Sequence, residues 1–124
     1  MKTMLFALAA LFLSVSLLAG PCPDNMTGEV KTSVDYIPLV SPKQWNERFP
    51  HYVAEHLKFL IGQMQAGNLE SAGPFLLGND TYGGQAIYRG GDAEKAKATA
   101  SHDPLVKNGL VKLVARPWLK CRLK

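Results

Sequence analysis

The hydrophobic positions of this chain change their period along its length, and each change predicts a new element. Near-alternation over residues 30–37 predicts a first strand, which Pro38 closes. From Gln44 the apolar residues return every three or four positions, which predicts a long helix that ends at Gly67. One stripe of this helix contains five apolar side chains: Val53, Leu57, Leu60, Ile61 and Met64. We expect this stripe to face the core.

Two further strands follow the long helix. Residues 69–77 predict a strand that Gly73-Pro74 interrupts, and the glycine-rich residues 78–84 predict a turn. Residues 85–89 then predict a third strand. Together these segments indicate a hairpin.

The last part of the chain supplies one more helix and one more strand. Asp92 predicts the cap of a helix over residues 93–100, and residues 110–118 predict the final strand. The resulting order β-α-β-β-α-β is typical of an α+β, ferredoxin-like fold, an antiparallel four-stranded sheet with two helices on one face. The other face of such a sheet is uncovered, so we expect a homodimer that pairs through it.

The amino terminus has the composition of a targeting segment. Lys2 precedes an apolar run from Met4 to Leu18, and small residues follow at Ala19-Gly20. This pattern predicts a cleavable signal peptide over residues 1–20, a flexible leader over 21–28, and one domain over 29–124. The mature protein would be secreted or periplasmic. A membrane anchor is the alternative, but a run of about 15 residues is shorter than the ~20 that span a bilayer. Lipidation of Cys22 is a second alternative, which the intervening Pro21 disfavours.

Charge and cysteine content narrow the partners. The 124 residues carry a formal net charge of +4, and only the carboxyl end is rich in basic residues. No dense basic patch is interleaved with aromatic residues, so we expect no nucleic-acid partner and, after processing, no stable membrane span. Cys22 and Cys121 are a candidate disulfide for an oxidising compartment.

A succession of spaced residues carries a family resemblance. The residues are, in order, His56-Leu57, Gly67, Ser71-Ala72-Gly73-Pro74, His102-Asp103-Pro104, Gly109 and Arg116-Pro117-Trp118. Over roughly residues 51–118 the chain resembles the YCII-related (YciI-like) proteins, in which a helix histidine, a glycine, Ala-Gly-Pro and Asp-Pro recur in this order.

The resemblance implies a ferredoxin-like monomer that pairs into a dimeric α/β barrel. It implies a pocket with a histidine and an aspartate, which fall on His56 and Asp103 in this sequence. It places Ser71, Gly73 and Pro74 beside that pocket. Members of the family include a few proteins that dehalogenate or isomerise small organic molecules, so an unidentified small molecule is the expected ligand.

The chemistry of His56 and Asp103 leaves two interpretations open. A histidine at the edge of the apolar stripe could move a proton near neutral pH, and a carboxylate on one ring nitrogen would fix its tautomer. Alternatively, His56 is a structural histidine at the core boundary, and Asp103 caps a turn that begins at Pro104. Gly73-Pro74 is likewise a bend or a bulge in its strand.

Other chemistries fit the sequence poorly. His51 and His56 are five residues apart, whereas a helical zinc pair is four apart, so we expect no metal and no cofactor. Ser71 lacks the surroundings of a nucleophile. We therefore hypothesise a cofactor-independent enzyme that uses His56 and Asp103 for proton transfer, elimination or isomerisation. The alternative is a non-catalytic module, for small-ligand binding or envelope stress, whose cavity is lined by aromatic residues: Tyr36, Tyr82, Tyr88, Phe75 and Trp118.

Overall fold

The computed structural model describes residues 22–124. The expected signal peptide, residues 1–20, lies outside them. The described chain divides into two compact units. The larger spans Val30–Trp118, and the smaller contains residues 22–29 and Leu119–Lys124. Within residues 22–124, no helix is both long enough and apolar enough to cross a membrane.

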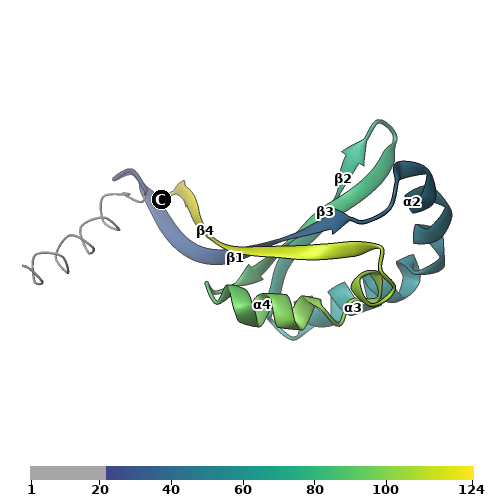
Figure 1. Ribbon diagram of the computed structural model, residues 1–124. Helices are drawn as coiled ribbons and strands as arrows, with labels where there is room; N and C mark the ends of the chain where they lie inside the picture. Colours follow the sequence, from purple (N-terminus) through teal and green to yellow (C-terminus); the bar gives the residue numbers. More distant parts are fainter. Residues whose placement is uncertain (1–21) are drawn as a thin grey trace, which may run out of the picture. The chain divides into compact units, whose positions relative to one another are not determined.

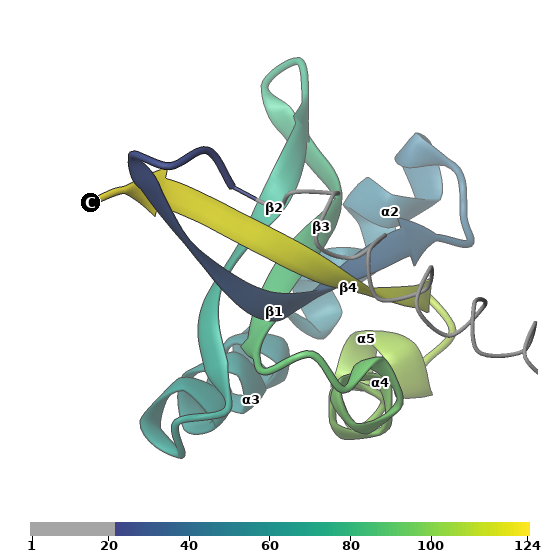
Figure 2. The same cartoon turned by 90° about the vertical axis from the view of Figure 1, so that its left-hand side faces the viewer.

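The elements follow the predicted order, except that the first predicted helix is divided into three pieces and one short helix, α5 (Pro104–Lys107), is added. In chain order they are β1 Met26–Pro38, α2 Pro42–Arg48, η1 Phe49–His51, α3 Val53–Gln65, β2 Leu69–Leu77, β3 Asp80–Arg89, α4 Ala93–Ala100, α5 Pro104–Lys107 and β4 Val111–Leu123. The strands form one sheet of order β2-β3-β1-β4, and β3 is antiparallel to both of its neighbours. Helices α3 and α4 lie on the same side of this sheet (Figures 1 and 2). The α+β ferredoxin-like prediction is confirmed.

The predicted long helix is divided into three pieces. Helix α2 ends at Arg48, a short 3₁₀ turn covers Phe49–His51, and α3 begins at Val53. Pro50 explains the break, because its nitrogen has no hydrogen to donate to the preceding turn. The expected end is confirmed, since Gly67 follows α3 with φ +83°.

The predicted apolar stripe of α3 is only partly in the core. Leu60 is buried, but Leu57, Ile61 and Met64 are 48%, 52% and 39% exposed. His56 and Leu60 take the inward direction, and Leu57 and Ile61 each lie one residue further along, which turns them to the flank of the helix. An ionisable side chain therefore points inward from a position that a purely apolar stripe would fill.

Three strands are longer than predicted. β1 already begins at Met26, inside the expected leader, and β4 continues to Leu123. β3 begins at Asp80, because the turn consists only of Gly78 and Asn79. The remaining glycines of that segment lie inside β3, where the register with β2 shifts between Pro74 and Leu76.

Alternation along the two central strands places their apolar side chains against the helices. Val34 and Tyr36 of β1, and Ala86 and Tyr88 of β3, are buried in the core cluster together with Leu60 of α3. This alternation sets the direction of Tyr36, which reaches the site described below.

The smaller unit contains the predicted disulfide. Cys22 and Cys121 are bonded, with 5.7 Å between their Cα atoms, which is an ordinary separation for a disulfide. In the same unit the backbone N–H of Lys124 donates to the carbonyl of Asn25 at 3.2 Å.

Among the glycines that the structure describes, Gly83 alone combines a positive φ with a close contact at the position of a Cβ atom. It has φ +75°, and a Cβ there would lie 2.6 Å from the carbonyl oxygen of Tyr36. Gly78 also has a positive φ, +66°, but a Cβ there would meet nothing within 4 Å. We expect Gly83→Ala to lower the free energy of unfolding by about 3 kcal/mol and Gly78→Ala by about 1 kcal/mol in urea denaturation. Equal losses in the two variants would contradict the close approach at Gly83.

Candidate active site

His56 approaches Asp103 from the inward face of α3. Its Nδ1 lies 2.7 Å from Oδ2 and 3.0 Å from Oδ1 of Asp103. The His56 side chain is 13% exposed, and that of Asp103 is fully buried. The structure therefore brings together the two predicted catalytic residues, which are 47 positions apart in the sequence.

Asp103 is both a helix cap and the partner of His56. Its Oδ1 accepts a hydrogen bond of 2.9 Å from the backbone N–H of Leu105 at the start of α5, directly after Pro104. The two interpretations of Asp103 are thus compatible, because one carboxylate has enough lone pairs for both contacts.

Tyr36 is the third member of this cluster, with a polar role that its position in a predicted strand did not indicate. Its hydroxyl donates to Oδ2 of Asp103 at 2.9 Å. Burial raises the pKa of Tyr36 well above its ordinary value, and the negative charge of Asp103 and this hydrogen bond add to the effect. The alternation of β1 could have placed Tyr36 on the core face, but its pairing with Asp103 depends on the tertiary fold.

Tyr88 lies near the same carboxylate without bonding to it. It is 3% exposed, and its hydroxyl has no hydrogen-bond partner among the described residues. Burial raises the pKa of Tyr88 to about 12, and the charge of Asp103 adds to this shift. Tyr36 and Tyr88 are therefore two buried tyrosines beside one carboxylate, of which only Tyr36 donates to it.

The hydrogen bonds of Asp103 determine the tautomer of His56. An ionised carboxylate only accepts hydrogen bonds, so Nδ1 of His56 is the donor. In the neutral ring, Nε2 then carries the lone pair, and no group within residues 22–124 bonds to it. The imidazole lies edge-on to the rings of Tyr36 and Phe49, with centroids 6.0 and 6.1 Å away. These contacts hold a basic nitrogen in a fixed orientation.

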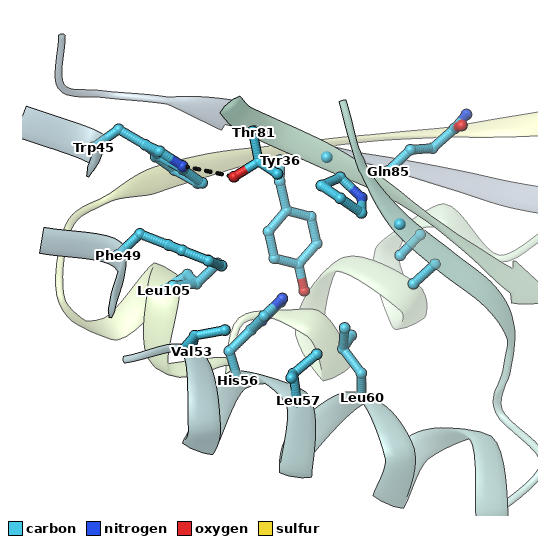
Figure 3. A pocket seen from close by; sticks show the side chains of 16 residues that line it. Tyr36, Trp45, Phe49, Val53, His56, Leu57, Leu60, Thr81, Gln85 and Leu105 are labelled. Atoms are coloured by element: carbon cyan, nitrogen blue, oxygen red, sulfur yellow. Dashed lines mark hydrogen bonds between the residues drawn. The ribbon is translucent and has the colours of Figure 1, made fainter. Parts of the chain in front are cut away.

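His56 forms part of the wall of a cavity of about 280 Å³. Figure 3 shows His56, Leu57 and Leu60 on α3, Trp45 and Phe49 together on another side, and Tyr36 across from α3. The lining residues are Tyr36, Trp45, Phe49, Val53, His56, Leu57, Leu60, Ala72, Gly73, Pro74, Thr81, Gly83, Gly84, Gln85, Ala86 and Leu105. None of them is Lys, Arg, Asp or Glu, so the cavity offers a proton acceptor in apolar surroundings.

Helix α2 and the η1 turn together supply an aromatic wall that the sequence pattern did not indicate. Ser41 caps the helix by accepting from the N–H of Gln44, and this places Trp45 in the core. Trp45 stacks on Phe49 with centroids 5.1 Å apart, and its indole N–H donates to the hydroxyl of Thr81 at 3.3 Å (Figure 3). The spacing of four residues between Trp45 and Phe49, both inside the predicted helix, was the available signal.

The predicted binding residues separate into two groups. Gly73 and Pro74 line the cavity beside His56, as expected. Ser71 does not line this cavity: it is exposed and lines a second hollow with Phe75 and Ile87, which Gly73 and Pro74 also line. Successive side chains of β2 point to opposite faces, so Ala72 enters the cavity in place of Ser71.

Most of the proposed aromatic lining lies elsewhere. Tyr36 lines the cavity, whereas Phe75 lines the second hollow. Tyr82 does not line the cavity and forms a T-shaped pair with Trp45, with centroids 5.9 Å apart, and Trp118 is exposed. Within residues 22–124, no group of three or more His, Cys, Asp or Glu side chains is placed to hold a metal ion.

The two buried tyrosines predict a loss of stability at alkaline pH. Unfolded tyrosine ionises near pH 10, whereas Tyr36 and Tyr88 keep their protons to higher pH when folded. Their contribution is therefore complete below pH 10 and is lost as the pH rises from there towards the folded pKa. For Tyr88 we expect a loss of about 1 kcal/mol at pH 11, measured by urea denaturation. Tyr36→Phe and Tyr88→Phe should each lose less between pH 8 and pH 11 than the wild type, and losses as large as those of the wild type would contradict the assignment.

A solved structure and a family model match this chain. The chain resembles the solved structure of 5-chloro-2-hydroxyhydroquinone dehydrochlorinase from Burkholderia phenoliruptrix in complex with 2,5-dihydroxybenzoquinone, with a TM-score of 0.56 and 21% identity. The match covers 71% of this chain and 92% of that one, and at this identity it supports the fold alone. No curated protein sequence matches. The profile of the YCII-related domain matches residues 35–117, more than half of the 124 residues. The chain therefore belongs to the YCII-related domain family.

Proposed function

We propose that this protein is a cofactor-independent enzyme that moves a proton on a small organic molecule, with His56 as the general base. The observation that carries this proposal is the pairing of a fully buried carboxylate, Asp103, with Nδ1 of His56 at the wall of an apolar cavity. A histidine with one nitrogen fixed and the other free beside a cavity is suited to general acid–base catalysis.

The chemistry needs only the residues that the cavity contains. Nε2 of His56 accepts a proton from a C–H or O–H group of the substrate, and Asp103 stabilises the imidazolium that results. In an elimination, the electron pair left on the substrate forms a new π bond and the leaving group departs with its own bonding pair. In an isomerisation, His56 returns the proton to a different atom. Neither reaction requires an oxidant or a reductant.

The cavity favours an uncharged, ring-sized substrate. It has no Lys or Arg in its lining, so a carboxylate or phosphate group would be buried without a counter-charge. A cavity of roughly 150 Å³ holds benzene, so 280 Å³ admits a ring with substituents. The structurally similar dehydrochlorinase acts on a chlorinated hydroxyhydroquinone. Hydroxylated and halogenated ring compounds are therefore the first substrates to test.

The proposal also includes a secreted or periplasmic location and a homodimer. The disulfide between Cys22 and Cys121 supports a secreted or periplasmic location, because such bonds persist in oxidising compartments. Phe75 of β2, and Val114 and Trp118 of β4, are exposed, and strand alternation turns the two β4 residues away from the helix-facing core. An apolar surface there supports a homodimer.

The test is a substrate screen with matched histidine variants. We expect the mature protein to turn over one or more halogenated hydroxyhydroquinones or related phenols. His56→Gln should lower the rate by roughly 10²- to 10⁴-fold, the typical contribution of a general base. Asp103→Asn should lower it as well, whereas changing the exposed His51 or His102 to Gln should not. A folded His56→Gln variant with full activity would exclude the mechanism, and binding without any turnover would favour the alternative ligand-binding module.

A further inference from the structure

We infer that Tyr36 is a positioning residue of this site, which acts through Asp103 to shift the ratio of neutral to protonated His56 towards the neutral ring. The inference deepens the proposed function and rests on it for its catalytic meaning. Its physical content, a dependence of His56 protonation on a hydroxyl that does not touch the ring nitrogens, is independent of any substrate.

Two hydrogen-bond donors meet at one oxygen atom of Asp103. Oδ2 of Asp103 accepts from Tyr36 at 2.9 Å and from Nδ1 of His56 at 2.7 Å. Oδ1 accepts from the N–H of Leu105 at 2.9 Å. Tyr36 and His56 therefore share the negative charge of the same oxygen. A hydrogen bond from one donor reduces the stabilisation that this charge gives to the other donor.

The effect of this sharing on the protonation of His56 has a definite direction. A protonated imidazole gains stability from Asp103, and it gains more when the charge on Oδ2 is not already satisfied by another donor. The Tyr36 hydroxyl therefore weakens the hold of Asp103 on a proton at His56, while it fixes the position of Oδ2. The raised pKa of Tyr36 supports this role, since the hydroxyl stays a donor through the neutral range.

Among the side chains around His56, Tyr36 is the one that donates a hydrogen bond to Asp103 and can be changed without changing His56 itself. From η1 the neighbour is Phe49, which carries no charge. On α3 itself the charged residues Glu55 and Lys58 are exposed. From β3, Tyr88 lies close enough to feel the charge of Asp103 but donates no bond to it. Tyr88 is thus a natural control: a second buried tyrosine beside the same carboxylate, without the hydrogen bond.

The experiment measures the ratio of protonated to neutral His56 rings at neutral pH by NMR of ¹³C- and ¹⁵N-labelled histidine in the full mature protein. Tyr36→Phe removes the donor, and we expect the ratio to rise by about 3- to 10-fold, part of what a hydrogen bond to a charged group contributes. Tyr88→Phe should leave the ratio within about 1.5-fold of the wild type. No change in Tyr36→Phe, a fall, or an equal rise in both variants would overturn the inference.

A second variant covers the case in which Tyr36→Phe does not fold. Site-specific replacement of Tyr36 by 3-fluorotyrosine keeps the ring and the hydroxyl and makes the hydroxyl a stronger donor. The ratio should then fall below that of the wild type, and an unchanged or higher ratio would overturn the inference. These measurements need no substrate. A failed substrate screen would therefore count against the proposed function alone, and an unchanged ratio against the role of Tyr36 alone.

Discussion

The rest of the site depends on the hydrogen bonds that the buried carboxylate of Asp103 accepts. This carboxylate joins three parts of the fold, because its hydrogen bonds come from β1 through Tyr36, from α3 through His56 and from the first turn of α5 through Leu105. A charge with no exposure to water is tolerated only when its lone pairs are satisfied. The same three bonds that make Asp103 acceptable in the core also fix the orientation and tautomer of His56. The hydrogen bonds of Asp103 therefore account both for its place in the core and for the candidate catalytic geometry of His56.

The cavity beside this carboxylate is formed by backbone features as much as by side chains. The break at Pro50 separates α2 from α3, and this allows Trp45 and Phe49 to form an aromatic wall. On the sheet, Gly83 permits a close approach to β1 where the register of β2 and β3 shifts. The cavity thus lies where two elements depart from regular geometry, a common position for a functional site.

Sequence periodicity predicted the order of elements, and its failures have physical reasons. The bounds of β2 and α4 followed from turn residues and from the cap at Asp92, which are local signals. His56 and Asp103 came from a family resemblance, and no local pattern could supply their contact across 47 positions. Tyr36 was interpreted as an ordinary aromatic residue of a strand, because its hydrogen-bond partner, Asp103, is brought close only by the tertiary fold. Ser71 lines a neighbouring hollow and not the cavity, because a likeness of short motifs does not specify which face of a strand a residue occupies.

The most direct test of this account is the tautomer of His56, read from the ¹⁵N NMR signals of its ring at a pH where the ring is neutral. The structure predicts a single form with the proton on Nδ1, bound to Asp103, and with a bare Nε2 available to a substrate. A neutral ring protonated on Nε2 would leave Nδ1 with no hydrogen to donate to the carboxylate. That result would contradict the pairing at the centre of the fold and of the proposed mechanism.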